Sequence, residues 1–411
     1  MARLTYVLVG GGLTSARAAE ALRQAGSDDD IMLVGEESHL PYERPDLSKG
    51  FLAGKRQRRE LDTLDADWYA EHDVELRLGV TATHLDPAAR RVRLSDGGFV
   101  EYDRLLLATG SAPTRLGVEG GDLAGVHYLR TVDHSERLKQ VLADGGPLVV
   151  VGAGWIGMEV AAVAREHGLD VTVVEPAPTP LNRVLGDELG RWFADLHRGH
   201  GVDVRTGTSV ARLRGDGRVK EVVTDSGEAL PARAVLVAIG VGPRTELAVG
   251  ARLEVSDGVV TDGRLRTSDP YVWAAGDVAS VDNAWAGRRL RVEHWANAND
   301  QGSFVGRSMV GAGEEWARPP FFFTDQYDAG MEYWGWVDPT AATLVVRGKP
   351  ADGAFAAAYL VVGAVHAALH VNRWDDGPAL KALVERKAVV DPERFADPGE
   401  PLPEGERPVS R

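Results

Sequence analysis

The amino-acid sequence predicts an α/β protein with two doubly wound parallel sheets and a C-terminal α+β domain. Residues 4–36 and 147–175 each read as an apolar strand, a helix and a second apolar strand. Each half later adds an apolar run that ends in small residues, at 102–113 and 233–243. From about residue 318 strand patterns dominate, with one late helix. Because a helix between two strands returns the chain in the same direction, the repeated units favour parallel sheets.

Length and composition indicate an ordinary folded protein with two or three cores. The chain has 411 residues, 44% of them hydrophobic, and a formal net charge of −15. This charge argues against nucleic acid or an anionic membrane as a general partner. The start of the chain lacks the zones of a secretory signal, so we expect a cytoplasmic protein. The longest apolar run, 355–371, is too short to span a bilayer and predicts two buried strands turning at Gly363.

Two glycine-rich turns each follow a strand pattern and open a helix pattern. In chain order they contain Gly10, Gly12 and Ser15, then Gly152, Gly154 and Gly157. Glycine lets the backbone approach a pyrophosphate, whose negative charge the helix N-terminus attracts. The second turn matches the dinucleotide pattern fully, whereas Ser15 stands where a third glycine or alanine is usual. Either turn alone could be an ordinary loop, but together they predict two dinucleotide-binding, Rossmann-like domains.

An acidic residue ends the strand that follows each glycine-rich turn. These residues are Glu36 and Glu175, and we expect both to accept hydrogen bonds from ribose hydroxyls. A carboxylate at this position repels a 2′-phosphate, and no arginine precedes Arg183 after Glu175. The sequence therefore favours NADH over NADPH. The alternative for Glu36 is a solvated loop acid beside Glu37.

Two dinucleotide sites in one chain indicate electron transfer between two cofactors. Nicotinamide gives up electrons as a hydride, whereas a flavin can take a pair and release single electrons. We therefore expect FAD and NADH, with their rings facing each other. The chain has no cysteine, which excludes a redox dithiol and thiolate-bound metal. No histidine spacing indicates a metal site: His197 and His200 are expected at the surface, and His366 and His370 in strands.

Segment 39–52, "HLPYERPDLSKGFL", contains two prolines, Pro41 and Pro45, and two cations. Arg44 and Lys49 could offset a pyrophosphate or an anionic reduced flavin; the alternative is a proline-rich surface loop. Gly276 and Asp277 follow a late apolar strand, as if the chain returned to the first domain for a further ligand contact. That return predicts a first domain that is discontinuous, with the second inserted in it.

At these residues the chain resembles the FAD-dependent NAD(H) ferredoxin reductases of the putidaredoxin-reductase type, within the two-dinucleotide-binding-domain flavoproteins. Besides the glycine turns, the segments "LPYERPDLSK", "LLLATGSAP", "AAGDVA", "VEHWANANDQG" and "FFFTDQYD" occur in the family's order. The resemblance covers nearly the whole chain. It implies FAD in a first domain, 1–113 and 242–318, NADH in a second, 114–241, and a C-terminal reductase domain, 319–411, that closes over the flavin.

The resemblance also implies a role for each matching residue. Lys49 and Glu159 are the catalytic candidates, as a buried ion pair near the nicotinamide and flavin N5. The residues implied to contact FAD are Gly10, Gly12, Ser15, Glu36, Arg44, Lys49, Thr109, Gly110, Gly276, Asp277, His294 and Trp295. Those implied to contact NADH are Gly152, Gly154, Gly157, Glu159, Glu175 and Gly240. His294 and Trp295 could instead be packing residues, and Glu159 an exposed helix acid, although its apolar neighbours favour burial.

The sequence departs from the family in the C-terminal segment. Phe323 and Thr324 stand where the pattern "FWSDQ" has tryptophan and serine. Phe323 is expected to contact a cofactor, and the change puts the aromatic wall against the flavin, or the exit route for electrons, in doubt.

The resemblance implies hydride transfer from NADH to FAD, then single-electron transfer to a [2Fe–2S] ferredoxin serving an oxygenase, by a monomer or homodimer. Ferredoxins are acidic, so a negative reductase needs a basic docking face. Residues 54–60 supply such a face or, alternatively, a solvated charge run, with Lys55, Arg56, Arg58 and Arg59. Two alternatives for the function remain: an NADH oxidase or quinone reductase of the same fold, and a redox sensor that binds FAD and NADH.

Overall fold

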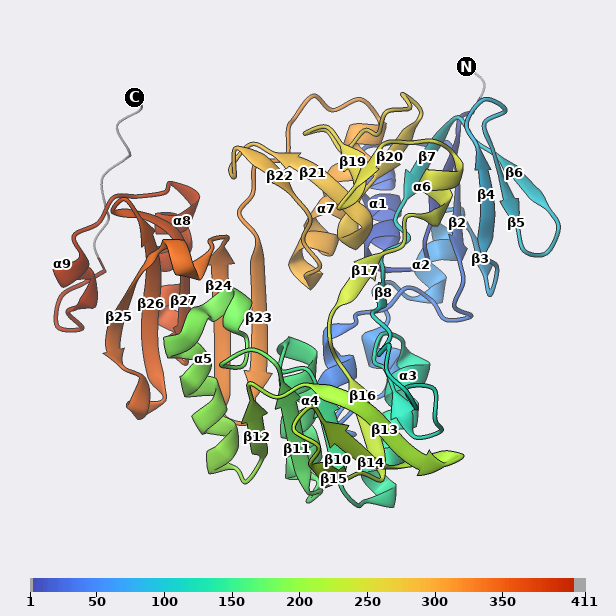
Figure 1. Ribbon diagram of the computed structural model, residues 1–411. Coiled ribbons are helices and arrows are strands. Elements are labelled where there is room, and N and C mark those ends of the chain that lie inside the picture. Colours follow the sequence, from blue (N-terminus) through green and yellow to red (C-terminus); the bar gives the residue numbers. More distant parts are fainter. Residues whose placement is uncertain (1–2, 403–411) are drawn as a thin grey trace. The chain divides into compact units, whose positions relative to one another are not determined.

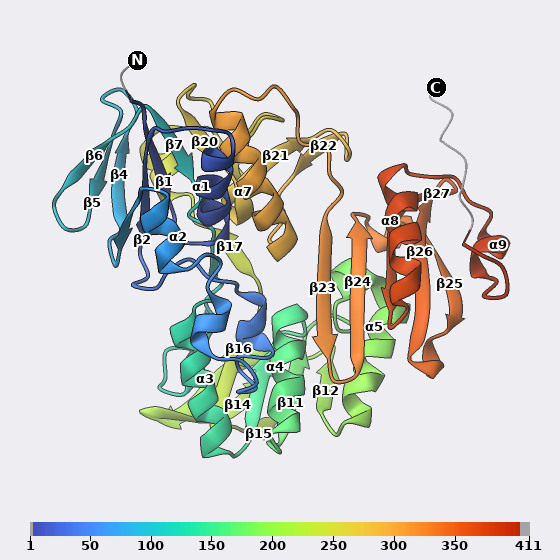
Figure 2. The ribbon, with the colours of Figure 1, turned by 180° about the vertical axis from the view of Figure 1, so that it is seen from behind.

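The computed structural model describes residues 3–402 and has the expected α/β class (Figures 1 and 2). These residues form two compact units. The first comprises the chain up to Glu43, Arg58–Ala112 and Gly242–Pro320. The second comprises Arg44–Gln57, Pro113–Val241 and the chain from Phe321 onward. The outermost parts of the predicted domains, residues 1–2 and 403–411, lie outside the described residues, and the division into three domains stays a prediction.

The first unit is built on a parallel sheet with strand order β20-β7-β1-β2-β3. Its strands are β1 (Thr5–Val9), β2 (Asp30–Gly35), β3 (Val74–Leu78), β7 (Arg104–Leu107) and β20 (Val272–Ala274). Most of their side chains are apolar and buried, as expected for strands covered on both faces. The register places the start of α1 at the carboxyl end of β1, where ligands of such sheets bind.

Helices α1 (Leu13–Gln24) and α7 (Trp295–Met309) lie side by side in the first unit (Figures 1 and 2). Small residues allow this close approach. A Cβ on Gly302 would lie 2.6 Å from the carbonyl oxygen of Thr14, and one on Gly306 would lie 2.6 Å from that of Ala18. The late segment of the chain is therefore part of the same core as the first strand, as a discontinuous arrangement requires.

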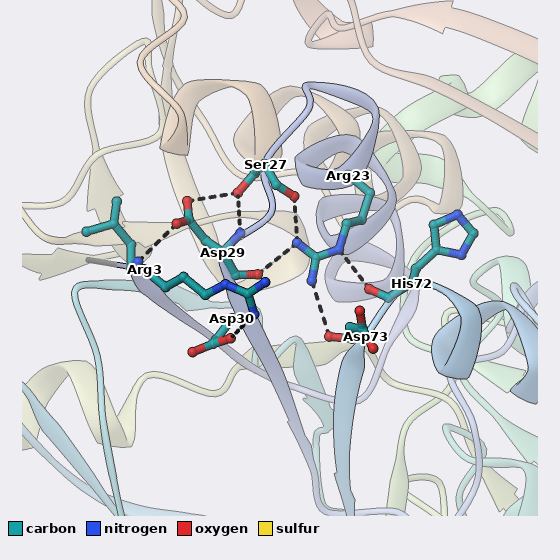
Figure 3. Close-up of polar contacts among 8 residues, drawn as sticks. Arg3, Arg23, Ser27, Asp29, Asp30, His72 and Asp73 are labelled. Carbon is teal, nitrogen blue, oxygen red and sulfur yellow. Dashed lines mark hydrogen bonds and ion pairs between the residues drawn. The ribbon is translucent and has the colours of Figure 1, made fainter. Parts of the chain in front are cut away.

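Arg23 fixes the carboxyl end of α1 to the edge of the sheet (Figure 3). Its guanidinium donates to the carbonyl oxygens of Ser27 at 2.7 Å, Asp29 at 2.8 Å, His72 at 2.8 Å and Asp73 at 3.2 Å. These bonds join α1, the turn before β2 and the turn before β3. The carboxyl end of α1 is therefore held by the turns that lead into the two neighbouring strands.

The remaining elements of the first unit are short. They are α2 (Ala66–Glu71), α6 (Glu246–Gly250), the antiparallel strands β4 (Ala82–Asp86), β5 (Arg91–Leu94) and β6 (Phe99–Glu101), and β18 (Val255–Ser256), β19 (Gly258–Thr261), β21 (Ala279–Asn283) and β22 (Arg288–Leu290). Two short helices, η2 (Arg58–Leu61) and η3 (Gly276–Val278), complete it. Strands β8 (Ser111–Pro113) and β17 (Val241–Pro243) pair with each other.

The second unit repeats the parallel design with strand order β12-β11-β10-β16-β9. Its strands are β9 (Val126–His127), β10 (Leu148–Val151), β11 (Val171–Glu175), β12 (Asp203–Thr206) and β16 (Ala234–Val237). The helices are α3 (Val132–Asp144), α4 (Trp155–Glu166) and α5 (Asn182–Gly199), with η1 (Pro45–Ser48) contributed from the early chain. Strands β13 (Val210–Asp216), β14 (Arg218–Thr224) and β15 (Ala229–Pro231) form an antiparallel sheet.

The C-terminal part of the second unit is an antiparallel sheet of order β23-β24-β27-β26-β25. Its strands are β23 (Phe321–Gln326), β24 (Ala329–Gly335), β25 (Thr343–Lys349), β26 (Ala354–Val361) and β27 (Ala364–Val371). Its helices are α8 (Gly377–Glu385), α9 (Pro392–Ala396) and the short η4 (Pro339–Ala341), η5 (Pro350–Asp352) and η6 (Trp374–Asp376). The expected turn at Gly363 is confirmed: Val362 and Gly363 both have positive φ and join β26 to β27. Residues of α5, including Phe193, share one apolar core with this sheet. None of the helices in residues 3–402 has the length and apolarity needed to cross a membrane.

Candidate active site

The first glycine turn is shaped for close approach of a ligand. Gly10 has φ +129°, and a Cβ there would lie 2.0 Å from the carbonyl oxygen of Ala108, so only glycine fits the turn. A Cβ on Gly12, by contrast, would meet no protein atom within 4 Å. Gly12 is also the N-cap of α1, where no side chain caps the helix and no acid occupies the first turn. The free amides and the helix dipole suit an anion such as a pyrophosphate.

Ser15 fills the position of the usual third glycine. Its side chain lies in the first turn of α1 and is 0% exposed. Its hydroxyl has no hydrogen-bond partner among the described residues. The serine is therefore accommodated as a small packing residue on the strand, and its contact with a cofactor stays a prediction.

Apart from Arg44 and Lys49, which lie in the second unit, the other residues implied to hold FAD lie in the first unit. Arg244 connects several of them. Its guanidinium forms an ion pair with Glu36. Its backbone accepts from the Thr109 hydroxyl at 2.7 Å and donates to the Gly110 carbonyl oxygen at 2.9 Å. The Glu36 carboxylate, whose side chain is 53% exposed, is thus paired with a cation after the end of β2. Sequence reasoning missed Arg244, because only the fold brings it beside Glu36.

The return of the chain at Gly276 and Asp277 is also in the first unit. Gly276 donates its backbone N–H to Gln301 at 2.8 Å, and the buried Asp277 carboxylate accepts from the Ser111 hydroxyl at 2.8 Å. His294 is the N-cap residue of α7, and Trp295 begins that helix and donates its indole N–H to the Glu43 carboxylate. These residues combine buried acceptors with an open helix N-terminus, which fits a polar cofactor.

The second glycine turn resembles the first: one glycine is required by the backbone, and another has open space beside it. Gly152 has φ +100°, and its Cβ would lie 2.4 Å from the Ala238 carbonyl oxygen. A Cβ on Gly157 would lie 2.2 Å from the carbonyl oxygen of Gly152, so this glycine lets α4 pack on its strand. At Gly154 the nearest protein atom is 4.0 Å away, and this residue caps α4 without a side-chain bond. The residues therefore fit a second dinucleotide.

Glu175 ends β11 and folds back onto this turn. Its carboxylate accepts from the backbone N–H of Ala153 at 2.7 Å and of Ala177 at 2.9 Å. It therefore braces the glycine turn in addition to any bond it makes to a ribose. Gly240 has φ +109° with open space at its Cβ position, and Arg183 is an exposed residue of α5.

The predicted ion pair of Glu159 and Lys49 is present in the second unit. Glu159 lies in α4 and is 4% exposed, and Lys49 Nζ is 2.8 Å from its Oε1. The carboxylate also accepts from the hydroxyls of Ser48 and of Thr324, the latter at 2.7 Å. Lys49 Nζ lies 5.2 Å from the ring centroid of Phe323. A buried carboxylate with three polar contacts and a neighbouring aromatic ring is a rigid, charged group.

Segment Arg44–Gln57 belongs with this cluster rather than with the first glycine turn. The Arg44 guanidinium donates to the carbonyl oxygen of Arg130, and Ser135 donates to the Leu47 carbonyl oxygen at 2.8 Å. These bonds hold η1 against α3, which places Ser48 and Lys49 beside α4. The alternative of a loose proline-rich surface loop is therefore wrong for this segment.

The expected surface position of His197 is also wrong. His197 lies in α5 and is 0% exposed, and its Nε2 is 2.8 Å from the Gln326 side-chain oxygen. Burial lowers the pKa of His197 to about 4. The local sequence is amphipathic, but the partner of His197 comes from β23, far along the chain. His200 is exposed, and His366 and His370 lie in β27 as expected.

The basic residues at 54–60 largely have acidic partners. Lys55 lies 3.6 Å from Glu166, Arg56 pairs with Asp46, and Arg58 lies 2.5 Å from Asp62. Arg59 is exposed. These pairs reduce the net positive charge of the segment, so its role in docking stays a prediction.

Comparisons with known proteins place the chain in a family. Residues 4–302 match the family model described as pyridine nucleotide-disulphide oxidoreductase, and residues 321–404 match the model described as reductase C-terminal. The chain belongs to the pyridine nucleotide-disulphide oxidoreductase family. The predicted resemblance and the α/β fold class are thereby confirmed, and this member of the family is an oxidoreductase without cysteine.

Relatives of this oxidoreductase match over almost their whole length. It is 37% identical to rhodocoxin reductase of Rhodococcus erythropolis, covering 96% of this chain and 92% of the relative. It is 39% identical to the anthranilate 1,2-dioxygenase system ferredoxin–NAD(+) reductase component of Burkholderia cepacia, covering 96% and 97%. The solved covalent complex of putidaredoxin reductase and putidaredoxin matches with a TM-score of 0.93 and 34% identity, covering 97% of each chain.

The structure groups the predicted site residues of this oxidoreductase into two sets. The first unit holds Gly10, Gly12, Ser15, Glu36, Thr109, Gly110, Gly276, Asp277, His294 and Trp295. The second unit holds Arg44, Lys49, Gly152, Gly154, Gly157, Glu159, Glu175, Gly240 and Phe323. Within the described part of the chain, no three histidine, aspartate or glutamate residues gather as metal ligands.

Proposed function

We propose that the chain is an NADH-dependent ferredoxin reductase with FAD and NADH as its cofactors. It passes electrons singly to a [2Fe–2S] ferredoxin that serves an oxygenase. The observation that carries this proposal is the match over nearly full length to rhodocoxin reductase, at 37% identity, and to the ferredoxin–NAD(+) reductase component of the anthranilate 1,2-dioxygenase system, at 39% identity. Two glycine turns with open ligand-facing positions support it. The cysteine-free sequence supports a purely flavin-based route.

The first unit would hold FAD and the second NADH. The N-terminal amides of α1 and α4 would receive the two pyrophosphates, with Gly12 and Gly154 leaving space for them. Glu36, steadied by Arg244, and Glu175 would accept from the ribose hydroxyls. Bound FAD supplies the chemistry, because a flavin accepts a hydride and releases electrons one at a time.

The protein's own contribution is binding and orientation. Glu159 and Lys49 form a fixed pair of opposite charges in the second unit, and Phe323 covers the lysine. We propose that this pair lies at the nicotinamide and tunes the charge around the reacting ring. No protein nucleophile is needed, since orientation and electrostatics provide the rate.

The proposed partner is a small acidic electron carrier. The proposed location of both proteins is the cytoplasm. The described residues have no helix that could cross a membrane, which agrees with a dissolved carrier as acceptor. Docking near Lys55, Arg56, Arg58 and Arg59 is part of the proposal. Lys55 has the most exposed side chain of the three that have a recorded acidic partner, at 71%.

The test is reoxidation of the NADH-reduced protein under anaerobic conditions in a stopped-flow instrument. A purified [2Fe–2S] ferredoxin, a soluble quinone and oxygen are added separately. Reoxidation that is fastest with the ferredoxin supports the proposal. Faster reoxidation by oxygen or quinone would indicate an oxidase or quinone reductase instead. A change of association state on NADH addition, without turnover, would indicate a redox sensor.

A further inference from the structure

A buried chain of hydrogen bonds runs from α5 through β23 to Glu159 on α4, all within the second unit. His197 Nε2 is 2.8 Å from Gln326 Oε1, Gln326 Nε2 is 3.2 Å from Thr324 Oγ1, and Thr324 Oγ1 is 2.7 Å from Glu159 Oε1. His197 and Thr324 are 0% exposed, Gln326 1% and Glu159 4%. At its outer end, the Tyr327 hydroxyl lies 3.4 Å from His197 Nδ1, and Tyr327 stacks on the exposed His200.

The direction of each bond follows from its neighbours. The Gln326 amide nitrogen donates to Thr324, so its oxygen faces His197 and must accept. Because burial keeps the pKa of His197 near 4, the ring is neutral at neutral pH. Its Nε2 therefore carries the proton, and Nδ1 can accept from Tyr327. The Thr324 hydroxyl, which already accepts from Gln326, is left to donate to Glu159. Every donor in the chain points toward that carboxylate.

The common direction of these donors limits the function of the hydrogen-bond chain. A side-chain amide holds its N–H and C=O in fixed roles, so Gln326 interrupts proton movement and the chain does not conduct protons. It can, however, fix geometry: a buried donor or acceptor that loses its partner costs about 1–3 kcal/mol, so each member holds the next in one orientation. The last member held in this way is Oε1 of Glu159, which Lys49 Nζ also contacts.

We propose that His197 and Gln326 are positioning residues that act through Thr324 to fix the Glu159 carboxylate toward the nicotinamide of NADH. The proposal rests on the proposed function for the role of Glu159. It also assigns a task to Thr324, because its hydroxyl is the link between Gln326 and Glu159. His197 is more than a hundred residues away from Gln326 in sequence, and only the packing of α5 against β23 makes the chain continuous.

The experiment compares His197→Leu with His197→Gln in the FAD-loaded protein. Leucine removes the N–H donor, whereas the glutamine amide nitrogen can take the place of Nε2. The rate constant for flavin reduction by NADH is expected to fall about fivefold to tenfold in His197→Leu, as for loss of one buried hydrogen bond. The Kd for NADH and the FAD content should change less than about twofold, and His197→Gln should recover most of the rate. Equal rates for the two variants would overturn the proposal.

A second readout does not depend on NADH. Thermal unfolding is measured for His197→Gln, His197→Leu, Thr324→Val and the double variant His197→Leu with Thr324→Val. If the bonds form one chain, the loss of Tm in the double variant is clearly smaller than the sum of the single losses. Additive losses would contradict a continuous chain. If His197→Leu does not fold, Gln326→Met replaces it in both measurements with the same expected results.

The two measurements separate the two proposals. Dithionite reduces a bound flavin whether or not NADH is a substrate. If dithionite reduces the flavin of the wild-type protein and NADH does not, the proposed function fails. Non-additive Tm losses would still support the continuous chain of hydrogen bonds. If NADH reduces the wild type and all variants equally fast, the positioning role fails while the proposed function stands.

Discussion

At the scale of single residues, the site depends on a few carboxylates whose partners are fixed. Glu175 accepts from two backbone amides of its own unit, and Glu36 pairs with Arg244. Glu159 has a lysine and two hydroxyl groups as partners. The conformational entropy of these carboxylates is lost during folding, so it is not lost again when a ligand binds. The side chains are already oriented before binding.

Glu175→Ala should weaken NADH binding and narrow the preference for NADH over NADPH. The change releases the Ala153 and Ala177 amides, and it removes the proposed ribose acceptor together with the charge proposed to repel a 2′-phosphate. The KM for NADH is expected to rise about tenfold, as for a lost charge-assisted hydrogen bond, with a smaller rise for NADPH. Steady-state kinetics with both nucleotides measure this, with the exposed Asp170→Ala as control. An unchanged ratio of the two KM values would remove Glu175 from this role.

His197 should make the protein less stable in acid. Burial lowers its pKa from 6.5 to about 4, so between these values the unfolded chain binds a proton that the folded protein does not. The free energy of unfolding therefore falls as the pH falls from 6.5 toward 4, by up to about 3 kcal/mol. Urea unfolding of wild type and His197→Gln over this range measures the difference. Parallel curves for the two proteins would show that His197 does not titrate in this way.

At the scale of elements, the strand–turn–helix units position both nucleotide sites. Three positions in each glycine turn do separate work: the first makes the turn, the second leaves room for the ligand, and the third lets the helix pack. These units were predictable from sequence, because strand periodicity and turn glycines are local signals. The joining of segment Arg44–Gln57 to the second unit was not, since it depends on bonds such as Ser135 to Leu47, far apart in the chain.

The two outer glycines of the first turn should respond differently to alanine. Gly10→Ala strains a positive φ and places Cβ against the Ala108 carbonyl, so it should lower the free energy of unfolding by at least about 1–3 kcal/mol. Gly12→Ala meets open space and has extended backbone, so the protein without FAD should keep its stability. Gly12→Ala should instead lower the affinity for FAD.

The measurement is urea unfolding of the FAD-free variants together with fluorescence titration of FAD. The matched pair at the second turn should behave in the same way: Gly152→Ala should lower the stability, and Gly154→Ala should lower the affinity for NADH. If Gly12→Ala binds FAD as tightly as wild type, the space beside Gly12 is not where the cofactor lies.

At the scale of the whole molecule, a net charge of −15 must be reconciled with the acidic partner that we propose. The sequence identified Lys55, Arg56, Arg58 and Arg59, but not the carboxylates that pair with three of them. The buried chain from His197 to Glu159 was likewise beyond sequence reasoning, because its members come from three separate elements. Turns, strands and the Lys49–Glu159 pair could be predicted, whereas partners set by long-range packing could not.

Reversing Lys55 and Arg59 to glutamate should slow ferredoxin reduction and flatten its dependence on salt. Long-range steering depends on surface charge and is screened by ions, so the effect should be largest at low ionic strength. NADH-to-ferricyanide turnover should be unchanged. Arg218→Glu with Lys220→Glu on β14 alters net charge equally and serves as control. Equal loss of ferredoxin reduction in both double variants would show that only net charge matters.

We propose that one cysteine-free chain holds FAD and NADH and passes a hydride between them. An anaerobic titration of the purified yellow protein with NADH, followed by flavin absorbance, tests it most directly. One equivalent of NADH is expected to bleach the bound flavin completely. A colourless protein, or a yellow colour that persists with excess NADH while dithionite removes it, would contradict the account.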